Sequence, residues 1–282
     1  MIKFGPSGAA DRFYLEGNKH TEQMPVWIKD NGLDCFEYSF GRGVNVGEAK
    51  AASIKSAFET CGVEISVHAP YFINLATPED EKAVNSFNYI LSSAVTGRAM
   101  GANRVVFHPA SQGKETRDVT VKRTVERLKE LKVVITEHGL EDIKFCPETM
   151  GKLAQIGTIE EITDFCTLAD FYYPCVDFGH VNAREQGSLK TKEDYIVRLN
   201  YMINILGYEK VNNMHVHFSK IEYSSKGEVR HLTFADEDFG PEPIPFIEAL
   251  RQLKLEPYVV CESDGTQADD AKTLKDLYLS IS

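Results

Sequence analysis

Short apolar runs alternate with longer amphipathic segments along the whole chain, and this pattern predicts repeated β-α units. The short runs are rich in β-branched and aromatic residues, which is typical of strands that are buried on both faces. There are eight of them, at residues 2–5, 35–40, 64–68, 104–108, 143–148, 173–177, 213–217 and 258–262. Eight such units predict an α/β protein whose strands close into one (β/α)8 TIM barrel.

The segments between the strands show helical spacing. In residues 79–100 we predict one buried stripe. Its members are Val84, Phe87, Ile90, Leu91 and Val95. In residues 158–169, Thr158 stands where a helix begins and Glu161 follows three positions later. This spacing is typical of a capping box, so we expect a helix that begins after Thr158.

The organisation of the chain favours one domain. No stretch rich in Pro, Gly or Ser divides it, so we expect residues 1–282 to form a single TIM-barrel domain. A doubly wound open sheet is the alternative, but no glycine-rich phosphate-binding fingerprint follows any predicted strand.

Composition narrows the classes of protein. The net charge of −11 argues against binding nucleic acid through a broad basic face, although bound cations would add charge that this count omits. The six cysteines are scattered without a CxxC pair, which disfavours a disulfide scaffold. No apolar run approaches the roughly 18 residues that cross a bilayer. We therefore expect a cytoplasmic protein with no membrane partner.

Histidines and acids recur where the predicted strands end. The parallel strands of a barrel all end at one face, so these side chains are expected to meet there. The set is His68, His108, Glu148, Asp177, His180, His215, His231 and Glu262. One histidine at a strand end is more often structural, but burying this many ionisable groups together would be costly without cations. The mixture suits zinc, with manganese or magnesium as alternatives, and its size predicts two or three ions.

At these residues the chain resembles the endonuclease IV family of apurinic/apyrimidinic endonucleases, within the xylose isomerase-like TIM barrel superfamily. The resemblance is carried by VHAPYFINL at residues 67–75, FHPA at 107–110, PETMG at 147–151, VDFGH at 176–180, MHV at 214–216 and CE at 261–262.

The resemblance implies a trinuclear zinc site. Its ligand groups would be His68, His108 and Glu148 for one ion; Glu148, Asp177, His215 and Glu262 for the second; and His180 and His231 for the third. The resemblance also implies that a metal-bound hydroxide hydrolyses DNA on the 5′ side of abasic sites. Arg42 and Tyr71 match loop positions with which the family contacts the nucleic acid.

Three positions depart from the family pattern. Val229 replaces an aspartate of the third group, and either the adjacent Glu228 is a possible metal ligand in its place or the third site is weak or empty. Residues 232–240 are acidic where the family is rich in glycine, which would repel a phosphate backbone. His217 stands where the family has asparagine. We expect it to face away from His215 and to pack or orient a ligand rather than bind metal.

Two other functions remain open. A sugar isomerase or epimerase of the same superfamily would use one ion and a small sugar, and Glu148, Asp177, His215 and Glu262 match its ligand set. The candidate catalytic residues, Glu148 and Glu262, would then be the acid and the base. The second alternative is a non-catalytic relative that keeps the barrel. Glu37, in the second strand, would contact a sugar or belong to a hydrogen-bond network.

Overall fold

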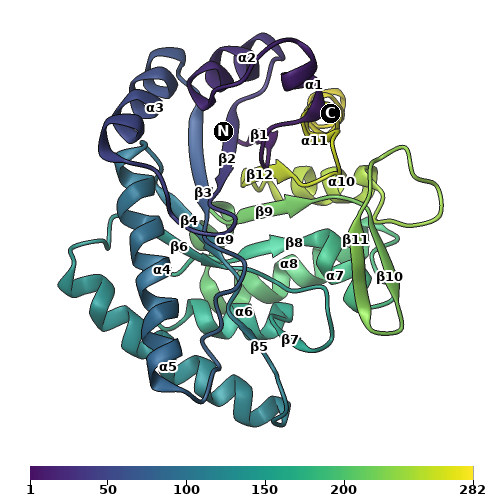
Figure 1. Ribbon diagram of the computed structural model, residues 1–282. Coiled ribbons are helices and arrows are strands. Elements are labelled where there is room, and N and C mark those ends of the chain that lie inside the picture. Colours follow the sequence, from purple (N-terminus) through teal and green to yellow (C-terminus); the bar gives the residue numbers. More distant parts are fainter. Residues whose placement is uncertain (282) are drawn as a thin grey trace.

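Eight parallel strands form the centre of the computed structural model, which describes residues 1–281 (Figure 1). All eight predicted strands are present, with ends shifted by two residues at most. Their bounds are Lys3–Pro6 (β1), Cys35–Ser39 (β2), Glu64–His68 (β3), Arg104–Phe107 (β4), Lys144–Pro147 (β6), Cys175–Asp177 (β8), His215–Phe218 (β9) and Tyr258–Cys261 (β12). Every pairing among them is parallel.

Two four-stranded sheets, β1-β12-β9-β8 and β2-β3-β4-β6, are joined at both edges. At one seam Ser7 bridges Glu37 and links β1 to β2, and at the other Glu148 bridges Cys175 and links β6 to β8. The wall therefore runs β1-β2-β3-β4-β6-β8-β9-β12 and returns to β1. This closure confirms the predicted TIM barrel and leaves none of the eight strands as an open edge.

Helices surround the barrel and shield the outer faces of its strands (Figure 1). The longer ones are Glu48–Cys61 (α3), Asp80–Ala99 (α4), Arg117–Glu137 (α5), Ile159–Cys166 (α6), Lys192–Leu206 (α8), Pro243–Leu253 (α10) and Gln267–Ser280 (α11). Shorter ones are Asp11–Leu15 (α1), Thr21–Gln23 (η1), Met24–Asp30 (α2), Phe178–Arg184 (α7) and Tyr208–Asn212 (α9). Within residues 1–281, no helix combines the length and apolarity that a membrane span requires.

Four short strands lie outside the barrel wall. Ala110–Ser111 (β5) pairs with Gln155–Ile156 (β7), and Ile221–Ser224 (β10) pairs with Gly227–His231 (β11), both antiparallel. The β10–β11 hairpin stands beside α7, at the end of the barrel toward which the arrowheads of β8 and β9 point (Figure 1).

The predicted capping box at Thr158 is confirmed. The amide of Glu161 donates to the Thr158 hydroxyl at 3.2 Å, and the Thr158 amide donates to the Glu161 carboxylate at 2.9 Å. Because two otherwise unpaired amides are satisfied, α6 begins where the sequence indicates. It ends at Cys166, three residues before the predicted end at Ala169.

The stripe predicted on α4 is partly wrong. Val84 and Val95 are 52% and 48% exposed, while the smaller Ala83 and Ala94 are buried. The prediction followed the large apolar residues, and some of these lie at the edge of the buried stripe rather than within it. Small residues on this face let the helix approach the barrel closely, and a Cβ on Gly97 would lie 2.8 Å from Val67.

The interior of the barrel is filled in layers, because alternate residues of each strand point inward. Toward the N-terminal end, the guanidinium of Arg104 lies 4.4 Å from the centre of the Tyr258 ring. Val106, Cys146 and Cys175 pack together in a small apolar cluster of their own. The inward positions at the C-terminal ends carry the histidines and acids.

The seam between β1 and β2 yields a stability prediction. A Cβ on Gly5 would lie 1.8 Å from the backbone oxygen of Cys35, so Gly5→Ala forces the backbones apart. We expect the free energy of unfolding, measured in denaturant, to fall by about 3 kcal/mol. Gly47→Ala is the control, because nothing lies within 4 Å of a Cβ there, and a weakened N-cap costs about 1 kcal/mol or less. Equal losses in the two variants would contradict this account of the seam.

Candidate metal centre

Histidines and carboxylates gather at the C-terminal mouth of the barrel in three groups. In each group the ligand atoms lie within 4.8 Å of one another. The groups are His68, His108 and Glu148; Glu148, Asp177, His217 and Glu262; and Asp177, His180 and His231. Glu148 belongs to the first two groups and Asp177 to the last two. The three groups therefore form one continuous centre.

Glu148 lies in the middle of this centre and is fully buried. Its Oε2 lies 3.2 Å from the Nε2 atoms of both His68 and His108. Its Oε1 lies 3.0 Å from Nδ1 of His217 and 3.4 Å from Nδ1 of His180. One oxygen of this carboxylate thus faces the histidines of the first group, and the other faces histidines of the second and third groups, the arrangement that a bridging ligand requires.

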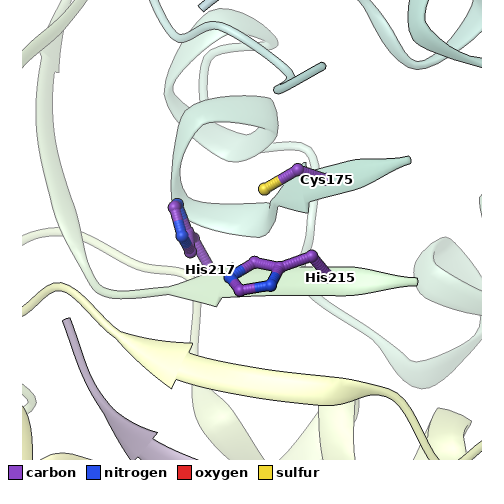
Figure 2. Close-up of side chains that lie close together, drawn as sticks. All are labelled: Cys175, His215 and His217. Atoms are coloured by element: carbon purple, nitrogen blue, oxygen red, sulfur yellow. The ribbon is translucent and has the colours of Figure 1, made fainter. Parts of the chain in front are cut away.

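His217 corrects the expectation drawn from the sequence. Residues two apart in a strand share a face, so His215 and His217 both point into the barrel, and the expected opposition of the two rings is wrong. The register sets His217 level with Asp177, and His215 one layer deeper, level with Cys175 (Figure 2). The structure therefore groups His217, and not His215, with Glu148, Asp177 and Glu262. The spacing of two residues between His215 and His217 was the sequence signal that both side chains point into the barrel.

The β10–β11 hairpin brings Glu228 to the third group. The register of the hairpin shifts between Glu222 and Tyr223. This bulge leaves Val229 out of the pairing between the two strands. Val229 is 49% exposed, whereas Oε2 of Glu228 lies 3.4 Å from Nε2 of His180. Because of the bulge, Glu228 points toward the centre. In a regular strand Val229 would do so, because it is two positions from His231.

The centre opens into a cavity of about 380 Å³. Its lining includes His68, His108, His180, Glu228, His231, Glu262, Tyr71 and Lys152. Tyr71 is 58% exposed at this opening, and Arg42 is exposed beside the lining residue Gly41. None of the acidic residues 232–240 lines the cavity. The repulsion expected from these residues would therefore act on a phosphate backbone outside the cavity.

Burial and charge oppose one another within the centre. Burial raises the pKa of the Glu148 carboxyl, but the charge of His217 and hydrogen bonds from His108 and His180 outweigh it and hold the pKa well below its usual range. Burial also raises the pKa of Asp177. Glu148 is accordingly an anion that depends on neighbouring positive charge.

The residues present fit divalent cations. Asp177 is fully buried, and its Oδ2 has no hydrogen-bond partner among the described residues, although the His180 ring lies 3.4 Å away. A buried carboxylate oxygen without a partner is costly, and a cation offsets that cost. Imidazole nitrogen together with carboxylate oxygen is a donor set that suits zinc or manganese.

A family model described as xylose isomerase-like TIM barrel matches residues 25–278. The chain belongs to the xylose isomerase-like TIM barrel family. This agrees with the closed barrel of parallel strands and with the position of the ionisable cluster at its C-terminal face.

Relatives in sequence include an uncharacterized protein and probable endonuclease 4 proteins. An uncharacterized protein of Methanocaldococcus jannaschii is 32% identical over 275 residues, which cover 98% of this chain and 96% of that protein. A probable endonuclease 4 of Staphylococcus epidermidis is 28% identical over 186 residues, which cover 64% of this chain and 60% of that relative.

Solved structures with this fold include both an endonuclease and a sugar epimerase. Endonuclease IV from Thermus thermophilus superposes with a TM-score of 0.70 at 17% identity, covering 99% of this chain and 100% of that chain. D-psicose 3-epimerase from Clostridium cellulolyticum superposes with a TM-score of 0.65 at 16% identity, covering 100% and 93%. Likeness at such identities shows the shared fold.

The electrostatics predict how pH affects the metal-free protein. Burial opposes protonation of His68, but the hydrogen bond and charge of Glu148 outweigh it and raise the pKa to about 9. A group whose pKa is raised in the folded state contributes its full stabilisation at pH values below its ordinary pKa, here 6.5. For His68 this contribution is lost as the pH rises through about 9.

We therefore expect the free energy of unfolding in excess chelator to decrease between pH 6.5 and 9, and to decrease less in His68→Gln. Denaturant titrations at each pH measure both slopes. His138→Gln is the control, because this exposed histidine contacts only a backbone carbonyl and its loss should leave the slope unchanged. Parallel slopes for His68→Gln and the unaltered chain would refute the role of His68.

Proposed function

We propose that this protein is a metal-dependent phosphodiesterase, loaded with two or three ions, zinc foremost, that hydrolyses DNA on the 5′ side of abasic sites. The observation that carries the proposal is the continuity of the three ligand groups through Glu148 and Asp177. Ions that share bridging carboxylates can act together on one phosphodiester. Similarity to probable endonuclease 4 proteins supports the same activity.

The histidines outside the middle group favour several ions over one. A one-ion centre needs only Glu148, Asp177, His217 and Glu262. His68 and His108 lie on one side of that group, and His180 and His231 belong to the third group with Asp177. Four additional imidazoles at the same cavity match the coordination of further ions.

The chain itself orients the carboxylates that would hold these ions. The amide of His180 donates to Oδ1 of Asp177 at 2.8 Å, which leaves Oδ2 free for a cation. The Ser7 hydroxyl donates to Glu262 at 3.1 Å. Zinc held by these residues would supply a lowered pKa of bound water and positive charge beside the phosphate. Tyr71 and Arg42, at the cavity mouth, would bind the DNA around an abasic nucleotide rotated out of the duplex.

A sugar epimerase is the second candidate, and one observation favours it. Glu148 and Glu262 have oxygen atoms within 4.8 Å of each other and belong to one four-residue group with His217. Such a pair could remove and return a proton at a carbon of a small sugar held by one manganese, magnesium or zinc ion. In this case His217 would be the histidine ligand of the single ion, the role that the sequence assigned to His215.

Cleavage of abasic DNA tests the proposal directly. The zinc-loaded protein is expected to nick a duplex that carries one synthetic abasic site, on the 5′ side of that site. Glu148→Gln should slow cleavage by about a hundredfold or more, because it removes the charge that joins two ligand groups. Glu130→Gln, on the exposed surface of α5, is the control and should cut normally. Intact duplex after incubation with fully loaded protein would exclude the nuclease.

Metal content separates the two candidates. Elemental analysis of the purified protein should give two or more zinc ions per chain. Glu228→Gln should lower the count by one, because it removes a carboxylate 3.4 Å from His180. Glu222→Gln is the matched control, since this residue of the same hairpin binds Arg230 at 2.7 Å. A single tightly bound ion in the unaltered chain would favour the epimerase.

A further inference from the structure

Glu37 lies inside the barrel, below the metal centre, and is fully buried. Its Oε1 lies 2.9 Å from Nε2 of His217 and accepts a hydrogen bond from the Ser7 hydroxyl at 3.0 Å. Its Oε2 accepts from the Ser66 hydroxyl at 3.1 Å and lies 3.0 Å from Nε2 of His215. Hydrogen bonds with Ser7, Ser66 and His217 therefore fix this carboxylate in one orientation, which settles the choice left open by the sequence in favour of a hydrogen-bond network.

The contact with Glu37 determines which nitrogen of His217 faces the centre. While Nε2 faces Glu37, Nδ1 lies 3.0 Å from Glu148 and 3.5 Å from Glu262. A histidine that binds metal generally donates its other ring N–H to a carboxylate or carbonyl, which fixes both tautomer and ring plane. Here the two nitrogens face carboxylates on opposite sides of the ring.

We propose that Glu37 is a positioning residue of the metal centre, which accepts the Nε2–H of His217 and thereby presents its Nδ1 to the ion held by Glu148, Asp177 and Glu262. The proposal rests on the metal binding in the proposed function and is independent of the substrate. The Ser66 hydroxyl donates to the second oxygen of Glu37 and the His215 ring lies 3.0 Å from it, so that the carboxylate itself does not rotate.

A different use of the same residues competes with this proposal. Cys175, His215 and His217 also bring ligand atoms within 4.8 Å of one another, from the adjacent strands β8 and β9 (Figure 2). A second ion there would have to take Nε2 of His217 from Glu37 or Nδ1 from the upper centre. Both nitrogens are already engaged, which favours the positioning role of Glu37 over a deeper metal site.

Nuclear magnetic resonance on the unaltered chain tests the proposal without any substrate. In protein labelled with ¹⁵N-histidine and loaded with ¹¹³Cd, the metal should couple to Nδ1 of His217, and Nε2 should carry a proton. Coupling through Nε2 of His217, or to either nitrogen of His215, would overturn the proposal. Failure to bind cadmium, zinc or cobalt at all would overturn the proposed function together with it, so the two failures are distinguishable.

Variants give a second measurement. Glu37→Gln keeps the volume of the side chain but removes its charge, and should weaken the tightest cobalt site by about 10- to 100-fold in competition with a chelator. It should also change the visible spectrum of the cobalt-loaded protein, which reports ligand geometry. Asp34→Asn is the matched control, because this carboxylate directly precedes β2, outside the barrel interior, and binds Lys275 at 2.7 Å. Equal affinity in Glu37→Gln and the unaltered chain would refute the role.

Ser66→Ala covers the case in which Glu37→Gln fails to fold. The Ser66 hydroxyl donates to Glu37 and, within residues 1–281, forms no hydrogen bond with a ligand of the centre. Its removal should loosen the Glu37 carboxylate and weaken cobalt binding several-fold, with the ¹¹³Cd coupling through Nδ1 of His217 retained. Unchanged cobalt affinity in Ser66→Ala, together with coupling through another nitrogen, would refute the proposal.

Discussion

The structure depends on how charge is compensated inside a closed barrel. Glu37, Glu148 and Asp177 are fully buried at its C-terminal end, where water cannot satisfy them. Each carboxylate removed from water costs several kcal/mol unless positive charge and hydrogen bonds replace the lost hydration (roughly 2–7 kcal/mol for a polar group, more for an ion). The surrounding imidazoles supply part of this compensation, and the arrangement of the shared carboxylates leaves room for cations to supply the rest.

Most of the fold could be predicted from the sequence because the pattern within each segment agrees with the fold of the whole chain. Strands buried on both faces require continuous apolar runs, and helices that cover them require amphipathic spacing, so the alternation of the two gives the barrel. Capping at Thr158 was predictable because it depends on residues three positions apart. The buried stripe of α4 was harder, because alanines pack there as closely as larger residues pack elsewhere.

The candidate site was only partly predictable, and the errors have physical causes. His217 was expected on the opposite face from His215, although strand parity puts both in the interior. The position of Glu228 depends on a bulge in a hairpin, and a bulge is set by pairing with another strand rather than by the local sequence. The role of Glu37 depends on contacts with residues up to 180 positions away, which no local pattern reveals.

Two of the residues at the centre, Glu228 and His231, belong to the β10–β11 hairpin and not to the barrel wall. The barrel strands can therefore keep their register while this appendage changes in length, sequence or twist. Under the proposed function, the number of ions bound would be an evolutionarily adjustable property, because remodelling this one hairpin would add or remove the ligands of the third group. A hydrolase and a one-ion isomerase would then differ less in the barrel itself than in the β10–β11 hairpin at its mouth.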